Sequence, residues 1–357
     1  MQLPFDRTLN LIYRSVNYFR VMVMKLLTFD AGSGLRLGGL LDDEQLVDLD
    51  HANQQLGGPS TPAFASLLHL MQAGDSALDA ARNIIDQVTS AGDDSLCIPL
   101  HQVQLHSPVP QPPRVRCFSV YERHMTQAID AVVRSRAGGA GVALNKILRF
   151  AKVPKDFYKG APYYKGNALS VIGPEDEVPW PSFAETKLDY EIELGVFIGT
   201  GGQDISRADA LSHVFGYTVY NDFSARDRLL EEMLGGSLGP IKGKDFEGGN
   251  AIGPWVVTKD EISNPQDLTM TVRVNDEIRA ETSTREMFYG IDAMIERASE
   301  GERLVPGEFI ATGAAADGTG IERWQFLAPG DVVELEIQGI GKLRNRVGQP
   351  RSDQSVG

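Results

Sequence analysis

The chain has 357 residues, of which 42% are hydrophobic and 23% are charged, the usual balance of a globular protein with a sizeable core. Its net charge of −14, from 34 basic and 48 acidic residues, argues against nucleic acid or an anionic membrane as the main partner. It has two cysteines, Cys97 and Cys117, and so offers no disulfide framework and no thiolate metal cluster. We therefore expect a cytoplasmic protein without a membrane-spanning helix, because no stretch approaches the roughly 18 apolar residues required.

The first segment, residues 1–23, carries three arginines against a single acid, Asp6. A basic, acid-poor segment of this kind is typical of an organelle-targeting peptide. It also fits a poorly ordered tail from an upstream start, with Met24 as the first residue of the folded protein. We prefer the second interpretation.

A small α+β domain is predicted over residues 24–107. Short alternating apolar runs bounded by glycine and acidic residues predict strands at 25–30, 35–43 and 45–50. The spacing of apolar residues over 62–89 predicts a helix. Residues 108–113 (PVPQPP) are too stiff and donor-poor for either element, and we interpret them as a linker.

Beyond the linker, residues 114–357 form the predicted catalytic domain. Strand signals dominate, Asn275 and Asp276 mark a hairpin turn, and residues 285–299 give the clearest helix. No regular alternation of strands and helices is present, so a doubly wound sheet is excluded. The sequence predicts an α+β protein, mostly β, whose C-terminal domain is a mixed β-roll or sandwich.

Two carboxylates, Glu191 and Glu193, lie two residues apart in a predicted strand. Side chains alternate in a strand, so these acids share one face while Ile192 and Leu194 share the other. At a separation of about 6.6 Å along the strand they could converge on one cation. Taken alone, the pair fits a solvated strand face better, because unpaired acids usually lie in water.

A second acidic cluster strengthens the metal interpretation. The apolar run FGYTVY ends in NDFSARD, which places Asp222 and Arg226 just past a buried strand, where functional sites are often built. Carboxylate ligands alone favour a hard cation such as Mg²⁺, Mn²⁺ or Ca²⁺ over zinc.

Five blocks of the sequence, in the same order, resemble the fumarylacetoacetate hydrolase family. They cover about residues 114–347 and read YYKGNALSVIGP, KLDYEIELGVFIG, GYTVYNDFSARD, KGKDFEGGNAIGPWVVT and PGDVVELEIQGIGKLRNRV. The resemblance implies a β-rich catalytic domain of the fumarylacetoacetate hydrolase type, a metal site open at one end, and a homodimer.

The resemblance also implies roles for single residues. Glu191 and Glu193 match the family's E-x-E metal ligands, and Asp222 matches the aspartate of its N-D-x-[ST]-A-R-D block. Lys244, in the run GKDF, matches a lysine that faces the substrate beside the metal. Tyr164 falls where some members place a tyrosine on the substrate, although a buried aromatic residue is an equally ordinary interpretation.

Arg226 matches an arginine near the carboxylate end of the substrate, with a structural ion pair to Asp227 or another nearby acid as the alternative. His124 aligns with the family's catalytic histidine, and Glu322 matches the acid that orients it. A carboxylate on one imidazole nitrogen fixes the tautomer, so such a pair can activate water.

Three departures from the family pattern are visible. Cys117 and Ser119 occupy the positions where longer hydrolases have an aspartate ligand and a tyrosine. Ala314 replaces the usual threonine after Thr312 and Gly313, in a loop that normally touches the substrate. Cys117 in place of the aspartate implies a centre with three protein carboxylates, and Ala314 implies a different substrate or reaction.

The resemblance implies a divalent-metal-dependent hydrolase that cleaves a C–C bond in a small anionic 1,3-diketo acid, of the kind met in the catabolism of aromatic compounds. The alternatives are a decarboxylase, isomerase or hydratase of 2-oxo acids in the same family. A relative that binds a ligand without catalysis is a further alternative. It is disfavoured because acids, base, lysine and arginine are all retained.

Overall fold

The computed structural model describes residues 23–92, 94–234 and 239–350, so nearly all of the tail predicted for residues 1–23 lies outside the described part. The first strands are β1 Lys25–Asp30, β2 Leu35–Leu40 and β3 Gln45–Asp48, which lie within the predicted ranges, although β2 and β3 end before residues 43 and 50. β3 ends at Asp48 because its carboxylate accepts the His51 N–H and so caps helix α2 Leu49–Gln55.

The prediction of one continuous helix over residues 62–89 is wrong, because three separate helices occupy this stretch. They are η1 Pro62–Ala65, α3 Leu67–Ala73 and α4 Asp75–Ala91. Ser66 is extended and caps α3 with its side chain, and Gly74, with a φ of 79°, separates α3 from α4. Apolar spacing alone did not reveal these two interruptions.

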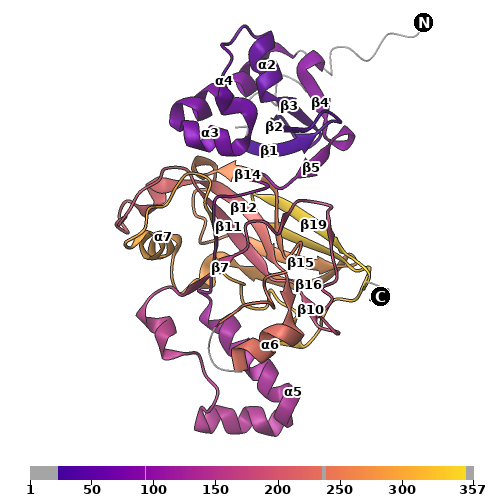
Figure 1. Cartoon of the computed structure of the whole chain (residues 1–357), viewed down its shortest axis with the longest axis vertical. Helices are drawn as coiled ribbons and strands as arrows, with labels where there is room; N and C mark the ends of the chain where they lie inside the picture. The colour runs from indigo at the N-terminus through magenta and orange to yellow at the C-terminus, as the bar shows by residue number, and fades with distance from the viewer. Residues whose placement is uncertain (1–22, 93, 235–238, 351–357) are drawn as a thin grey trace, which may run out of the picture.

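A large mixed sheet runs through the molecule (Figure 1) in the order β4-β3-β2-β1-β14-β12-β11-β17-β6-β7, with β5 on β1 and β8 on β14. The remaining members are β4 Cys97–Pro99, β5 Gln104–His106, β6 Val115–Phe118, β7 Tyr163–Gly166, β8 Val171–Ile172, β11 Ile192–Ile198, β12 Val214–Asp222, β14 Asn250–Thr258 and β17 Phe309–Ala311. The N-terminal strands join it because β1 pairs with β14 at Lys25 and Val257. The division into domains at residues 108–113 stays a prediction.

A second sheet has the order β16-β15-β18-β19-β9. Its strands are β9 Glu177–Val178, β15 Thr269–Val274, β16 Glu277–Ser283, β18 Val332–Ile337 and β19 Gly341–Val347. β15 and β18 alternate buried and half-buried or exposed residues, so one face is covered and packs against the main sheet. The predicted hairpin turn is confirmed: Asn275 and Asp276 both have positive φ, as a type I′ turn requires.

Two cores lie on opposite faces of the main sheet. Leu194 joins Val272 and Leu335 in the core between the two sheets. Phe197 joins Leu70 and Ile84 in a core that the N-terminal helices α3 and α4 cover. The mostly β, α+β fold class is therefore confirmed, with helices on one side of a sheet and a second sheet on the other.

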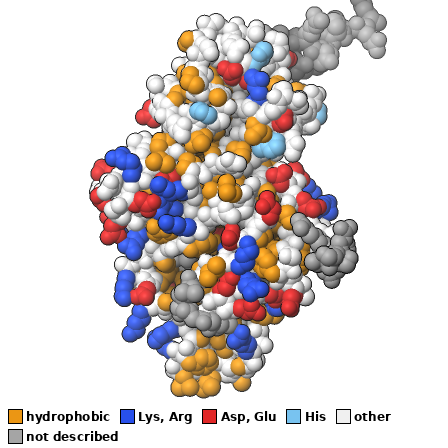
Figure 2. All heavy atoms as spheres, in the orientation of Figure 1, with side chains coloured by type: hydrophobic (Ala, Val, Ile, Leu, Met, Phe, Trp, Pro, Cys, Tyr) orange, Lys and Arg blue, Asp and Glu red, His pale blue; other side chains and the backbone are white. Residues whose placement is uncertain are grey.

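The longest helix, α5 Glu122–Leu148, was not predicted. Gly138, with a φ of 64° and a ψ of −170°, kinks it, and small residues in the sequence around the kink obscure the helical period. Its C-terminal half presents Leu144, Ile147 and Leu148 to solvent. Figure 2 shows hydrophobic side chains gathered at this end of the molecule, opposite the N-terminal helices.

The other helices are short. They are α6 Arg226–Leu234 and α7 Ile291–Ser299, the second within the range predicted, and the 3-10 turns η2 Asp94–Leu96, η3 Leu100–Gln102, η4 Lys155–Lys159, η5 Ala210–His213, η6 Lys259–Glu261, η7 Thr284–Glu286 and η8 Ile321–Arg323. A two-stranded sheet of β10 Leu188–Asp189 and β13 Ser224–Ala225 completes the fold. Within the described residues, no helix has the length and apolar character needed to cross a membrane.

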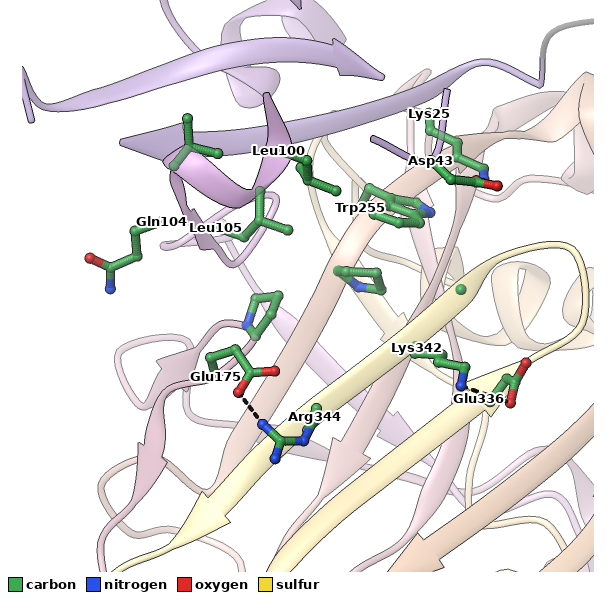
Figure 3. Close-up of a pocket in the computed structure, with 14 residues that line it drawn as sticks. Lys25, Asp43, Leu100, Gln104, Leu105, Glu175, Trp255, Glu336, Lys342 and Arg344 are labelled. Atoms are coloured by element: carbon green, nitrogen blue, oxygen red, sulfur yellow. Dashed lines mark hydrogen bonds and ion pairs between the residues drawn. The ribbon is translucent and has the colours of Figure 1, made fainter. Parts of the chain in front are cut away.

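A groove of about 850 Å³ lies where the N-terminal strands meet β14 and β19 (Figure 3). Trp255 and Leu105 form part of its apolar wall, and the ion pair of Glu175 with Arg344 lies on its rim. None of the predicted site residues lines this groove, so it is separate from the centre described next.

Candidate metal centre

Three predicted ligands meet at the ends of β11 and β12. Glu193 belongs to β11, Glu191 directly precedes that strand, and Asp222 is the last residue of β12. Antiparallel pairing places the start of β11 beside the end of β12, where the Asp222 N–H donates to the Glu191 carbonyl at 3.2 Å. One oxygen from each side chain lies within 4.8 Å of the others, and all three residues are buried.

Two buried cations accompany the carboxylates. Lys244 Nζ lies 2.8 Å from Glu191 Oε2 and 2.9 Å from Asp222 Oδ2. Arg226 donates from Nη2 to Glu191 Oε1 at 2.5 Å and from Nε to Asp189 Oδ2 at 2.8 Å. The structural pairing considered for Arg226 is therefore present, but its partners are Asp189 and Glu191.

The charges around the three acids shift their pKa values in different directions. Burial opposes ionisation of Glu191, but the adjacent Lys244 and Arg226 cations outweigh it and lower its pKa to about 2. Burial, followed by the charges of Asp222 and Glu191, raises the pKa of Glu193 well above its usual value. Burial also raises the pKa of Asp222, which Lys244 only partly offsets. Without a cation, the cluster therefore holds more negative charge than its surroundings stabilise.

The donor set fits a hard divalent cation. Among the described residues, Asp222 Oδ1 is a buried oxygen without a hydrogen-bond partner, while Oδ2 accepts from Tyr164 Oη at 2.5 Å. Glu193 Oε2 accepts the Gly313 N–H at 2.7 Å, which fixes its carboxylate plane. Oxygen ligands with such supporting bonds are the set that Mg²⁺, Mn²⁺ and Ca²⁺ prefer.

The predicted base and its partner also come together. His124 lies in the first turn of α5 and Glu322 in η8, and His124 Nδ1 is 2.9 Å from Glu322 Oε1. His124 is among the residues close enough to act electrostatically on Glu191, so the pair and the triad share one site. The Glu322 side chain is 2% exposed, while the His124 side chain is 12% exposed.

Two of the departures from the family pattern, Cys117 and Ala314, lie close to the triad. Cys117 is buried in β6, with Sγ 3.7 Å from Tyr220 Oη. Burial, then the charges of Asp222 and Glu193, raises the pKa of this thiol well above its usual value, so it stays a neutral neighbour of the triad. Ala314 is buried in the loop that follows Gly313.

Sequence reasoning missed Asp189, which is fully buried and binds Arg226. Its signal was available, because Asp189, Glu191 and Glu193 repeat with the strand period of two. The Gly313 N–H was also missed, and no side-chain pattern could have revealed a backbone donor.

Fold and site together define a β-rich protein with three buried carboxylates, which could hold a metal ion, beside a histidine–carboxylate pair. Residues 137–348 match the model of the family described as "Fumarylacetoacetate (FAA) hydrolase C-terminal". The chain belongs to the fumarylacetoacetate hydrolase family, which confirms the resemblance seen in the sequence.

The relatives include one protein named as a tautomerase and others named as hydrolases. Oxaloacetate tautomerase YisK of Bacillus subtilis (strain 168) is 31% identical over 331 residues, which are 91% of this chain and 100% of the relative. The structure of fumarylacetoacetate hydrolase from psychrophilic Exiguobacterium antarcticum is 28% identical with a TM-score of 0.66, covering 91% of this chain and 99% of that one. Maleylpyruvate hydrolase from Sphingobium sp. SYK-6, in complex with manganese(II) and pyruvate, is 25% identical with a TM-score of 0.66, covering 91% and 100%.

Proposed function

We propose that this chain is a divalent-metal-dependent enzyme of small 2-oxo acids, and that it hydrolyses a C–C bond in a 1,3-diketo acid of the acylpyruvate type. The single observation that carries the proposal is the His124–Glu322 pair, closed at 2.9 Å beside three buried carboxylates. Manganese(II) and pyruvate bound to the related maleylpyruvate hydrolase support both the cation and the substrate class.

In this proposal Glu191, Glu193 and Asp222 hold Mg²⁺ or Mn²⁺. When bound, such a cation polarises a carbonyl oxygen and stabilises the negative charge that develops on it. Tyr164 supports the site from outside by donating to Asp222, which keeps that carboxylate in one orientation.

His124 is the proposed general base. With its Nδ1–H donated to Glu322, the free acceptor is Nε2, which removes a proton from water as the water oxygen attacks the acyl carbonyl carbon. The bond between that carbon and the pyruvyl methylene then breaks, and its electron pair stays on the pyruvyl fragment as an enolate. Return of the proton to this fragment gives pyruvate and a carboxylic acid, so atoms and charges balance.

Lys244 and Arg226 supply positive charge next to the triad. Both side chains are already paired with Glu191, so they adjust the charge of the site and do not remove a proton. In the proposed complex they add attraction for the substrate carboxylate and for the developing oxyanion.

A second candidate is keto–enol tautomerisation of oxaloacetate, favoured by the full-length similarity to the Bacillus subtilis tautomerase. In that reaction His124 would carry a proton between C3 and the carbonyl oxygen, and no bond between carbons would break. Decarboxylation, isomerisation and hydration remain further variants of the same chemistry.

The test is turnover of a panel of acylpyruvates and oxaloacetate with Mn²⁺ and, in parallel, with a chelator. Product analysis by NMR separates the candidates, because hydrolysis gives pyruvate plus an acid and decarboxylation gives carbon dioxide. Tautomerisation changes only the enol absorbance. Activity that survives complete metal removal contradicts the whole proposal, and enol decay without cleavage replaces hydrolysis by the second candidate.

The remaining features of the proposal are a homodimer in the cytoplasm with a role in the catabolism of aromatic compounds. They rest on what the resemblance to the family implies, together with membership of that family. Size-exclusion chromatography with light scattering tests the dimer directly.

A further inference from the structure

Asp189 ends β10 and is fully buried, yet each of its carboxylate oxygens accepts two hydrogen bonds. Oδ1 accepts the N–H groups of Tyr190 at 2.9 Å and Gly320 at 2.8 Å. Oδ2 accepts the Ile321 N–H at 2.9 Å and Arg226 Nε at 2.8 Å. Neither oxygen lies at the proposed cation site, so the mechanism above gives this residue no task.

Those bonds join the two halves of the site. On one side, Arg226 extends from Asp189 to Glu191 and holds that carboxylate. On the other, the Gly320 and Ile321 N–H groups open the η8 turn that carries Glu322. We propose that Asp189 is a positioning residue that fixes the Glu322–His124 pair relative to the carboxylate triad.

Gly320 provides an independent observation. Its φ of −73° is open to any residue, so its backbone conformation does not require glycine. A Cβ there would lie 2.4 Å from Asp189 Oδ1 and 2.1 Å from the Gln325 carbonyl oxygen. The absence of a side chain therefore lets the backbone approach the Asp189 carboxylate closely.

The chemistry requires a carboxylate, and asparagine cannot replace it. All four partners are donors, and an amide has one oxygen and one NH₂ group. In one orientation the NH₂ group of an Asp189→Asn variant faces the N–H groups of Tyr190 and Gly320, and in the other it faces Ile321 and Arg226. Either way a buried donor is left opposite a donor, which shifts the η8 turn or the guanidinium.

The kinetic test rests on the proposed function and uses the substrate that the wild-type protein turns over, at saturating Mn²⁺. We expect Asp189→Asn to lower kcat by about 10 to 100-fold, comparable with other residues that support a metal site. If Asp189 acts through Glu322, the Asp189→Asn/Glu322→Gln double variant loses no more than Glu322→Gln alone. Losses that multiply in the double variant overturn the proposal.

The matched control is Glu308→Gln. Glu308 is also fully buried and paired with Arg114 and Arg116, but it supports neither the triad nor η8. We expect Glu308→Gln to lower the thermal stability and to have only a small effect on kcat. In a double variant with Glu322→Gln, the two fold-losses in kcat should multiply. A control that reproduces the non-additivity of Asp189→Asn contradicts a specific role for Asp189.

A readout without turnover keeps this proposal separate from the proposed function. In ¹⁵N-histidine-labelled, metal-free protein, the bond to Glu322 predicts that His124 holds the Nδ1–H tautomer. Asp189→Asn should convert that signal to a mixture of tautomers, whereas Glu308→Gln should leave it unchanged. An unchanged His124 signal in Asp189→Asn overturns the proposal, whatever substrates the enzyme accepts. If Asp189→Asn does not fold, Gly320→Ala displaces the η8 backbone from Asp189 and from the Gln325 carbonyl together, and an unchanged His124 signal in that variant overturns the proposal.

Discussion

Replacement of Glu193 by glutamine should have opposite effects on stability without and with metal. Glu193 is 1% exposed, and burial together with Asp222 and Glu191 raises its pKa well above the usual value. A carboxyl group whose pKa is raised on folding destabilises the folded state as pH rises above about 4.5, its value in the unfolded chain. Neutral glutamine removes that cost, and its oxygen can still accept the Gly313 N–H. In chelator at pH 7.5, Glu193→Gln should therefore melt at a higher temperature than wild type.

With metal, the wild type should gain more in melting temperature than Glu193→Gln does. A cation at about 100 times its dissociation constant stabilises the folded state by about 2.7 kcal/mol. At about 2.1 cal/mol/K of unfolding entropy per residue, the 357-residue chain gains about 4 °C in Tm for that energy. Wild type should show this shift, and Glu193→Gln should lose most of it because one of three ligands has lost its charge.

Differential scanning calorimetry with Mn²⁺ or EDTA, at pH 7.5 and pH 4, measures both parts. The advantage of the variant in EDTA should disappear at pH 4, where the wild-type carboxyl is protonated in both states. Glu308→Gln is the control, since it alters an equally buried acid outside the centre and should keep the full Mn²⁺ shift. The reasoning is refuted if Glu193→Gln retains the wild-type Mn²⁺ shift, or if it melts lower in EDTA.

Three further substitutions test other parts of the site. Tyr164→Phe removes the hydrogen bond to Asp222 and should weaken Mn²⁺ binding by about 10 to 100-fold in calorimetric titration, and unchanged affinity contradicts the outer support assigned to Tyr164. Glu322→Gln should lower kcat by about 100-fold at saturating Mn²⁺ while the Mn²⁺ affinity stays at the wild-type value, since it alters only the partner of His124. Burial opposes ionisation of Asp227, but the hydrogen bonds that its carboxylate accepts outweigh burial and lower its pKa. The ionised carboxylate therefore stabilises the fold above about pH 4, and this stabilisation is lost as the pH falls through the lowered pKa. Asp227→Asn should cost about 1 to 2 kcal/mol in urea unfolding at pH 7, and the difference should narrow as the pH falls below about 4.

The sequence predicted the strands well because their signals are local. β1, β2 and β3 follow from alternating runs bounded by turn residues, and the Asn275–Asp276 turn follows from the residue types that tolerate positive φ. Helix α5 was missed because its moderate amphipathic pattern is interrupted at Gly138. Its first turn is fixed by long-range contacts, such as that of His124 with Glu322, which no local pattern contains.

The candidate site shows the same limit. The spacing of Glu191 and Glu193 gave a shared face, but their meeting with Asp222 depends on the β11–β12 pairing. The resemblance to a family supplied that pairing indirectly, through ordered blocks. Contacts made by backbone groups, such as Gly313 N–H on Glu193, and bonds across the fold, such as Asp189 to Gly320, required the coordinates.

The choice between hydrolysis and tautomerisation depends on whether water has a place beside the base. Both reactions would use the same three carboxylates and His124, but hydrolysis alone needs a base that activates water, and the proposed His124–Glu322 pair therefore favours hydrolysis. The loop after Gly313 does bear on the choice, because it is hydrogen-bonded to Glu193 and continues with the buried Ala314. Alanine lacks the hydroxyl group of the family's usual threonine, so it offers one hydrogen-bonding group fewer to a substrate or to water. This loop therefore weakens the preference for hydrolysis, while the retained His124–Glu322 pair still favours that reaction.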